Sequence, residues 1–169
     1  MAYFKNLILP TKIGDRISAL NVNGLNDSDK QFRVVQSLKD SRADIFVLTD
    51  TRLKSCNGKN SIHAEIRDAV YCEPVDTLIK DRVDPKKYNP GIGRGILIAA
   101  RPGSGIDFSN LVASNDGNKL MVDVTNSKGL SFRLLAIYGP SQDDPAFFVK
   151  VVDELLNFDG KIISVGDYN

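Results

Sequence analysis

Histidine and cysteine are scarce in this sequence. Its 169 residues include one histidine, His63, and two cysteines, Cys56 and Cys72. The sequence therefore offers no metal site of the clustered histidine and cysteine kind. The two cysteines do not form a CxxC pair. Free thiols in a reducing compartment are the favoured interpretation, and a disulfide that closes a modest loop is the alternative.

The sequence also lacks an excess of charge of either sign. Lysine and arginine number 22 against 21 acidic residues, so the formal net charge is +1. Bulk charge thus predicts no polyanionic partner, and contact with a nucleic acid would need a local basic patch. The basic residues Lys80, Arg82, Lys86 and Lys87 lie in the segment Asp76–Gly93. We interpret this segment as an exposed loop, with contact to a DNA backbone as the alternative.

Long hydrophobic runs are missing as well. The N-terminal stretch Met1–Pro10 has no such run and no cleavage site, which indicates neither a signal peptide nor a membrane span. Apolar residues make up 42% and charged residues 25% of the chain, as is typical of globular proteins. The length suits one domain, or most of one.

What the sequence does contain is a series of apolar runs that end in polar residues. Short runs rich in branched side chains predict buried strands, and alternation predicts half-buried ones. The turn residues Asn126–Gly129 indicate a hairpin between two of these strands. The predicted strands are Arg16–Leu20, Ile45–Asp50, a strand within Gly93–Arg101, Lys119–Thr125, Leu130–Tyr138 and Lys161–Val165.

Helical periodicity occurs between these strands. One helix follows the capping residues Asp27–Asp29 and places Phe32, Val35 and Leu38 on one stripe. A shorter pattern after Asn60–Ser61 suggests another helix. The clearest helix has Asp144 as its cap and Pro145 at its first position, and ends at Asp159–Gly160. Its wide apolar face comprises Phe147, Phe148, Val151, Val152, Leu155 and Leu156.

Strands that alternate with helices predict a sheet covered by helices, with chemistry at the strand ends. If these ends converge, they form a site whose functional groups are carboxylates, amides and a phenol, all of which offer oxygen ligands. Hard cations such as Mg²⁺ or Mn²⁺ prefer such ligands. Taken singly, each residue is more often a turn or cap residue, so the inference rests on their ordered occurrence. The polar residues at the strand ends are Asn21, Asn23, Asp50, Tyr138, Asp167 and Asn169.

The same segments carry a family resemblance. In order along the chain, they are ISALNVNGLND, ADIFVLTDTRL, GRGILIAAR, LLAIYGPS and IISVGDYN. They resemble the ordered motifs of the endonuclease/exonuclease/phosphatase superfamily, from about Arg16 to the last residue. The turn NVNGL and the pattern TDTRL are similar to the endonuclease domains of LINE-type non-LTR retrotransposons and to apurinic-site endonucleases.

The resemblance implies a four-layered α/β sandwich, in which two sheets are flanked by helices, and a DNA-nicking activity that depends on Mg²⁺ or Mn²⁺. It implies that residues 1–169 form one incomplete domain that lacks the C-terminal strands of the superfamily. The residues that match the superfamily motifs imply three sets of site residues. The implied catalytic residues are Asp167, Asn169, Tyr138 and Asn21. The implied metal ligands are Asp50 and Asn21, and the implied contacts to nucleic acid are Asn23, Arg52 and Arg94.

The sequence departs from the superfamily pattern in three ways. Asp50 stands where its members have glutamate, which is one methylene longer, and Mg²⁺ is strict about ligand distance. Ser141 stands where asparagine is common. The terminal Asp-His pair of the superfamily has no counterpart in these residues, and His63 lies far from any matching motif. We therefore expect a weakly active or inactive endonuclease domain.

Two other functions remain open at this stage. One is a non-catalytic scaffold or self-association module derived from the same fold. The other is a phosphoesterase for a small phosphate or a lipid headgroup. An incomplete sandwich is expected to expose an apolar sheet face, to be covered by a second copy of the chain or by a complementing C-terminal half. DNA is the expected partner of the endonuclease, in an intracellular, nuclear location.

Overall fold

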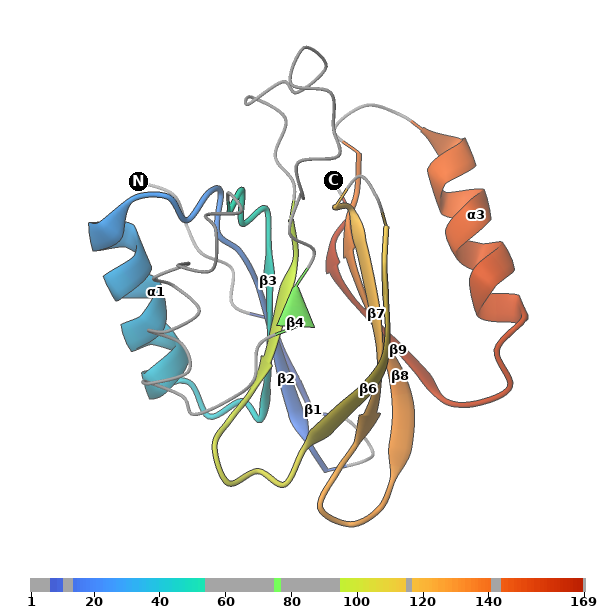
Figure 1. The fold of residues 1–169 in the computed structure, drawn as a ribbon, viewed down its shortest axis with the longest axis horizontal. Helices are drawn as coiled ribbons and strands as arrows, with labels where there is room; N and C mark the ends of the chain where they lie inside the picture. The colour runs from blue at the N-terminus through green and yellow to red at the C-terminus, as the bar shows by residue number, and fades with distance from the viewer. Residues whose placement is uncertain are drawn as a thin grey trace.

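Two β-sheets face each other in this protein, and a helix lies on the outer side of each (Figure 1). Among the described residues, no helix has the length and apolar character to cross a membrane. The computed structural model describes residues 7–10, 14–53, 75–76, 95–114, 117–140 and 144–168.

The first sheet has five strands in the order β1-β2-β3-β5-β4. Strand β2 runs parallel to β3, whereas the other pairs are antiparallel. Three of its strands, β2, β3 and β5, were predicted as separate apolar runs, and the sequence pattern missed β1 and β4. The strands are β1 (Leu7–Pro10), β2 (Arg16–Asn21), β3 (Ile45–Thr49), β4 (Val75–Asp76) and β5 (Leu97–Ala100).

The second sheet has four strands in the order β6-β7-β8-β9. Strands β7 and β8 form the predicted antiparallel hairpin, and β9 joins β8 in parallel. Strand β6 was not predicted, and all but one of its residues are exposed. The strands are β6 (Asp107–Ala113), β7 (Lys119–Thr125), β8 (Ser131–Tyr138) and β9 (Ile162–Asp167).

Both helices begin at the aspartates that the sequence marks as caps. Helix α1 (Ser28–Asp40) is capped by Asp27, whose carboxylate accepts a hydrogen bond from a backbone N–H of the first turn. Helix α3 (Pro145–Leu156) is capped by Asp144 in the same way, and proline occupies its first position. This helix ends at Leu156, before the predicted stop at Asp159–Gly160.

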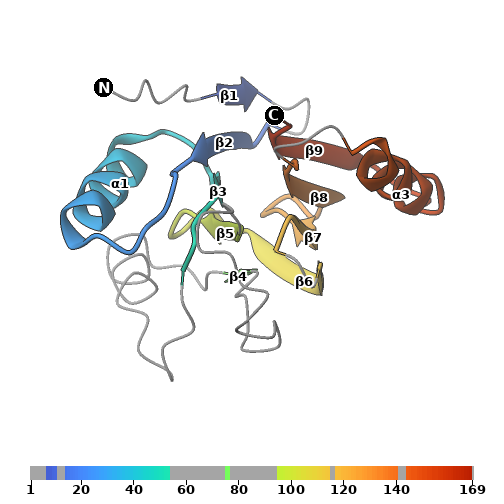
Figure 2. The same cartoon turned by 90° about the horizontal axis from the view of Figure 1, so that it is seen from above.

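The view from above shows four layers, in the order α1, first sheet, second sheet and α3 (Figure 2). Three apolar cores lie between these layers. The first core lies between α1 and the first sheet, the second between the two sheets, and the third between the second sheet and α3. This arrangement confirms the predicted α/β sandwich. The inter-sheet core contains, among others, Ile17 of β2, Val47 of β3, Ile98 of β5, Val122 of β7, Leu134 of β8 and Val165 of β9.

The inter-sheet core corrects one expectation about packing. We expected an apolar sheet face that a partner would have to cover. Instead, the described part of the chain supplies both sheets, and their inner faces bury each other. The reason is that the connection after β5 leads the chain into the second sheet, which closes over the first. The inner faces therefore give no grounds for a covering partner.

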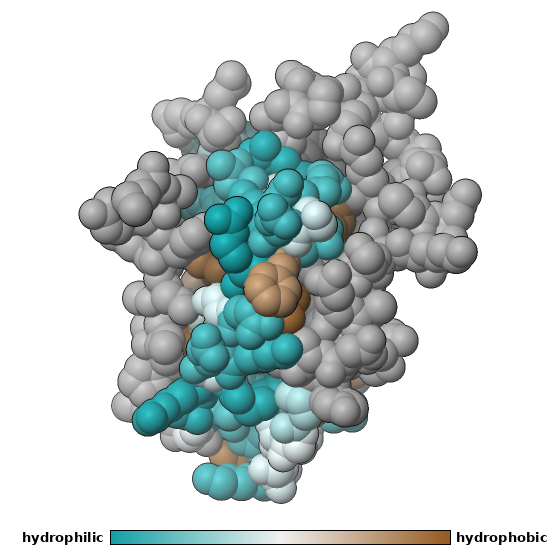
Figure 3. All heavy atoms as spheres, turned by 90° about the vertical axis from the view of Figure 1, so that its left-hand side faces the viewer, coloured by the Kyte–Doolittle hydropathy of each residue, from teal (hydrophilic) through white to brown (hydrophobic). Residues whose placement is uncertain are grey.

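The predicted apolar faces of both helices also need correction. In α1, Phe32 is 61% exposed, whereas Gln31 is buried with Val34, Val35 and Leu38. These four positions form one helical stripe, and the Gln31 amide donates a 2.5 Å hydrogen bond to the carbonyl of Leu25. That bond satisfies the buried amide. Figure 3 looks onto this side of the molecule, where most of the residues coloured by hydropathy are hydrophilic and only a few are apolar.

In α3, two of the six residues of the predicted apolar face are exposed. Phe147, Val151 and Leu155 pack against the second sheet. Val152 and Leu156 are 50% and 79% exposed and point away from this core. A helix that lies on one sheet buries a single stripe, so a wider apolar face than that stripe stays in solvent.

Candidate functional site

Three predicted site residues lie on the inner faces of the two sheets, at the same end of the sandwich. Asn21 ends β2 and follows Ile17 and Ala19, which face the inter-sheet core. Tyr138 ends β8 and Asp167 ends β9. These two residues are directly opposite each other in the parallel pairing, so their side chains lie on the same face. Tyr138 also packs against the inter-sheet core.

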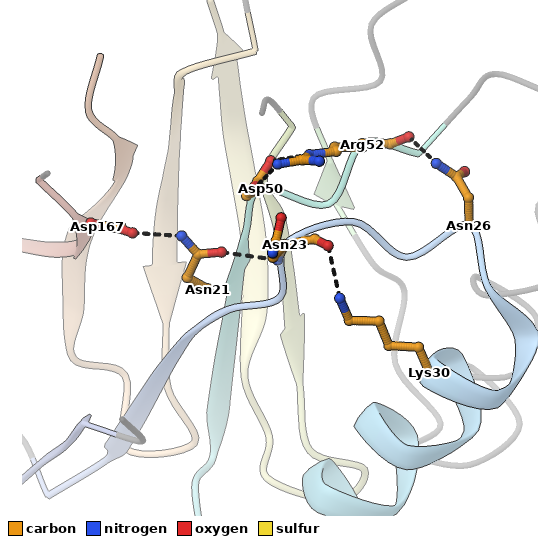
Figure 4. Close-up of polar contacts among 7 residues, drawn as sticks. All are labelled: Asn21, Asn23, Asn26, Lys30, Asp50, Arg52 and Asp167. Atoms are coloured by element: carbon orange, nitrogen blue, oxygen red, sulfur yellow. Dashed lines mark hydrogen bonds and ion pairs between the residues drawn. The ribbon is translucent and has the colours of Figure 1, made fainter. Parts of the chain in front are cut away.

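A hydrogen bond joins the two sheets at this end. The Asn21 Nδ2 donates to Asp167 Oδ2 at 2.5 Å, across 146 positions of sequence (Figure 4). The Asn21 Oδ1 accepts from the backbone N–H of Asn23 at 2.9 Å. The amide of Asn21 thus fixes the orientation of the Asp167 carboxylate and is itself held by the turn that follows β2.

Gly166 allows β9 to approach β8 closely beside this bond. Its φ is +150°, and a Cβ at this position would lie 1.9 Å from the carbonyl oxygen of Ile137. A similar approach occurs at Gly139, where a Cβ would lie 2.7 Å from the carbonyl oxygen of Tyr168. The glycine before Asp167 therefore has a steric function, since it sets where β9 presents that carboxylate.

The loop after β2 and the segment after β3 are held together by backbone hydrogen bonds. Gly24 N donates to the carbonyl of Asp50 at 2.7 Å, and Leu25 N to that of Thr51 at 2.8 Å. The side chain of Asn26 donates to the carbonyl of Arg52 at 2.9 Å. These bonds continue the β2–β3 pairing past the strand ends, so the two polar segments form one rim of the site (Figure 4).

Asp50 forms an ion pair within this rim. Its side chain is 3% exposed, and both carboxylate oxygens accept from the Arg52 guanidinium, Oδ1 from Nε at 2.8 Å and Oδ2 from Nη2 at 2.9 Å. Arg52 is 31% exposed. The pair is bidentate, the strongest geometry for these two groups.

Two residues on the rim were missed by the sequence analysis. Lys30, in the first turn of α1, donates from Nζ to the carbonyl of Asn23 at 2.7 Å. Asn26 holds the backbone at Arg52, as described above. The position of these two residues in the sequence could have indicated them. The loop NVNGLND leads directly into α1 and brings the first turn of the helix to the site.

Comparison with known proteins identifies the fold. No protein-family model and no curated protein sequence matches the chain. Among solved structures, TDP2 from C. elegans aligns with a TM-score of 0.56 and 17% identity, covering 90% of this chain and 47% of that one. A truncated Caenorhabditis elegans TDP2 aligns with a TM-score of 0.47 and 13% identity, covering 85% and 58%. The chain thus spans about half the length of the structures it resembles.

The described part of the chain shares the fold of the TDP2 structure, an α/β sandwich of two sheets. At this low identity the likeness describes the fold alone. The five segments that carry the motifs named above fall on β2, β3, β5, β8 and β9, in that order.

Within this fold, the structure brings together most of the predicted site. Asn21, Tyr138 and Asp167 share one end of the inter-sheet space, while Asn23, Asp50 and Arg52 form the adjoining rim. Among the described residues, no three histidine, cysteine or acidic side chains are close enough together to hold a metal ion. Several earlier predictions lie outside the described residues, namely those on Asn169, Arg94, Ser141, His63, Cys56, Cys72, the helix after Asn60–Ser61 and the loop Lys80–Lys87.

A second ion pair lies on the other side of the second sheet. Asp123 of β7 and Arg133 of β8 are cross-strand partners, with Nε 2.7 Å from Oδ1. The hydrogen bonds from Arg133 lower the pKa of Asp123, and those to Asp123 raise the pKa of Arg133. The guanidinium also lies 3.8 Å from the ring centroid of Phe158. This pair stabilises the outer face of the sheet and is a useful comparison for the pair at Asp50.

Proposed function

We propose that this protein is a metal-dependent phosphodiesterase that nicks DNA. The observation that carries the proposal is the hydrogen bond between Asn21 and Asp167, which joins a carboxylate and an amide from opposite sheets. Tyr138 lies in register beside that carboxylate. A carboxylate, an amide and a phenol at one end of an inter-sheet space are suited to hold a phosphate and to act on a water beside it.

The donor set fits a hard divalent cation. Asp50, Asp167 and the amide oxygen of Asn21 offer oxygen ligands, which Mg²⁺ and Mn²⁺ prefer. Mg²⁺ usually binds through one or two carboxylates, with water and substrate phosphate completing its coordination, so a third acidic residue is not required. When bound, such an ion would polarise the phosphate and stabilise charge on the leaving oxygen.

The residues of the chain have distinct roles in this proposal. Asp167 accepts a proton from the attacking water or orients it, and Asn21 keeps the carboxylate turned toward the inter-sheet space through its 2.5 Å hydrogen bond. The hydroxyl of Tyr138 donates to a nonbridging phosphate oxygen as charge develops there. By its place in the motif, Asn169 would donate to the same phosphate.

DNA as the substrate, and a retrotransposon type of endonuclease, rest on the resemblance of NVNGL and TDTRL to LINE-type domains. Arg52 and Asn23 lie on the rim, where they can contact a nucleic-acid backbone, and Arg94 is proposed to join them. Such contacts give affinity that falls with salt and little sequence choice. A nuclear location follows from this substrate. We expect low activity, since Asp50 is shorter than glutamate and is already paired with Arg52.

A plasmid-nicking assay tests the proposal. Supercoiled plasmid is incubated with the protein and Mg²⁺, Mn²⁺ or EDTA. We expect nicking that needs the cation and that falls by at least about 100-fold in Asp167→Asn, as is typical for the loss of an acid–base group. Asp153→Asn, which removes an exposed carboxylate of α3, is the matched control and should keep full activity. Nicking that persists in EDTA, or in Asp167→Asn, would refute the proposed function.

A self-association module is the second candidate, and the exposed face of α3 favours it. Val149, Val152 and Leu156 are 58%, 50% and 79% exposed and recur at helical spacing. A second copy of the chain is the proposed partner for this stripe. Light scattering over a range of concentrations should then show a dimer that Leu156→Lys converts to a monomer. A monomer at all concentrations would eliminate this candidate.

A further inference from the structure

The carboxylate predicted to hold the metal is occupied by a cation of the protein itself. Asp50 is buried, and each of its oxygens accepts one N–H of Arg52, at 2.8 Å and 2.9 Å (Figure 4). A divalent ion bound to the same carboxylate would lie next to this guanidinium. Two like charges at one buried carboxylate repel each other strongly, because little water is present to screen them.

The local backbone builds this pair into the site. Asp50 and Arg52 are two positions apart, and both adopt the left-handed conformation, with φ of +54° and +50°. Between them, the N–H of Thr51 donates to the carbonyl of Gly95 at 3.0 Å, and Gly24 N donates to the carbonyl of Asp50. Residues other than glycine adopt this backbone conformation only where the surrounding structure holds them in it. The turn after β3 is thus shaped to bring the two side chains together.

The two partners differ in their freedom to move. The Asp50 side chain is 3% exposed, whereas that of Arg52 is 31% exposed, so the Arg52 side chain has much more access to solvent than the Asp50 carboxylate. The stem of Arg52 lies against Gly24, where a Cβ would meet its Cδ at 3.4 Å. Arg52 is therefore the partner able to leave the pair, and its planar guanidinium suits the oxygens of a phosphate as well as those of a carboxylate.

We propose that Arg52 and the divalent cation are alternative partners of Asp50, and that a phosphodiester promotes the exchange by accepting Arg52. This inference rests on the proposed function, because it assumes that the site binds a metal. In the free protein, Arg52 neutralises Asp50 and keeps affinity for the cation low. When the guanidinium turns outward to a phosphate, Asp50 becomes available to the metal. Metal and substrate then bind with positive coupling, which must be reciprocal.

Arg52 would act as a positioning residue with two states, and Asp50 as the group that both cations share. The pair Asp123–Arg133 has the same bidentate geometry but lies on the outer face of the second sheet. It provides a matched control, since breaking it should not affect the metal site.

Mn²⁺ binding measures the competition directly, through the electron paramagnetic resonance signal of the free ion. We expect Arg52→Gln to bind Mn²⁺ at least about tenfold more tightly than the wild type, a size typical of coupling between sites. Asp50→Asn should abolish this gain, and Arg133→Gln should leave the affinity unchanged. Arg52→Lys keeps a cation that holds the carboxylate less firmly, so its affinity should be intermediate. Circular dichroism establishes that each variant is folded.

A second measurement compares Mn²⁺ binding to the wild type with and without a phosphodiester, and this comparison does not depend on a variant folding. Dimethyl phosphate, a diester without bases, should raise the Mn²⁺ affinity of the wild type but not that of Arg52→Gln. Equal affinities of folded Arg52→Gln and wild type, or no effect of the diester, would overturn the inference and leave the proposed function intact. Absence of Mn²⁺ binding in both proteins would overturn the metal site, and the inference with it.

Discussion

Replacement of Gly166 by alanine should damage the fold and the site together. The Cβ of an alanine would lie 1.9 Å from the carbonyl oxygen of Ile137, and Cβ atoms essentially never come closer than 3.0 Å to such a neighbour. Strand β9 would therefore have to shift from β8 by roughly 1 Å, and close-packed interiors resist such shifts. The shift would carry Asp167 away from Asn21, since Asp167 is the next residue.

The size of the effect follows from two contributions. The backbone at Gly166 has a φ of +150°, which residues other than glycine adopt at a cost of about 1–3 kcal/mol. Overpacking between β8 and β9 adds about 1–3 kcal/mol. We expect a loss of about 2–6 kcal/mol in the free energy of unfolding, a large share of the total of about 5–15 kcal/mol typical of a domain.

Urea unfolding, followed by circular dichroism, measures this loss. Gly129→Ala is the matched control, because Gly129 has a φ of +72° but no heavy atom within 4 Å of its Cβ position. It should lose only the backbone contribution, about 1–2 kcal/mol. If Gly166→Ala is no less stable than Gly129→Ala, the close approach of β8 and β9 does not constrain the glycine, and our account of its function is wrong.

Three further predictions concern stability. Asp123→Asn should destabilise the protein at neutral pH, because the hydrogen bonds from Arg133 lower the pKa of Asp123. The difference in unfolding free energy from the wild type should shrink as the pH falls below 3.8, because the stabilisation by the ionised carboxylate is then lost. Leu135→Ala should cost about 2–5 kcal/mol by urea unfolding, since Leu135 is fully buried beneath α3, whereas Leu156→Ala should change stability by less than about 0.5 kcal/mol. Asp27→Ala should cost about 1 kcal/mol by removing the cap of α1. A difference between Asp123→Asn and the wild type that does not change with pH would contradict the first prediction. Similar losses for the two leucine variants would contradict the second, and an unaltered unfolding midpoint for Asp27→Ala would contradict the third.

Much of the fold could be predicted because local patterns and tertiary packing agree. Strands β3, β7 and β8 are apolar or alternating over their length, and α1 and α3 begin at residues with cap chemistry. Strand β6 was missed for the opposite reason. It lies at the edge of its sheet with its residues largely exposed, so its sequence, DFSNLVA, lacks the alternation of a half-buried strand.

The site was predictable only in part. Strand ends are visible in a sequence, and this located Asn21, Tyr138 and Asp167, whose strands meet in space. The pairing of Asp50 with Arg52 was not foreseeable, because it depends on left-handed backbone at both residues. The prediction that Phe32 lies on the buried stripe of α1 was wrong for a related reason. Periodicity gives the spacing of a helical stripe, but the packed position of the helix decides which of two neighbouring stripes faces the sheet.

The bond between Asn21 and Asp167 has a consequence for how the proposed site forms during folding. Its two residues are separated by 146 positions, and the intervening chain builds most of both sheets. Contacts between such distant positions form late, because the entropy of closing so long a loop must be offset by other contacts first. The pair should therefore be assembled only when the rest of the sandwich is in place. A partly folded molecule would lack the oriented carboxylate, so the proposed site would be complete only at the end of folding.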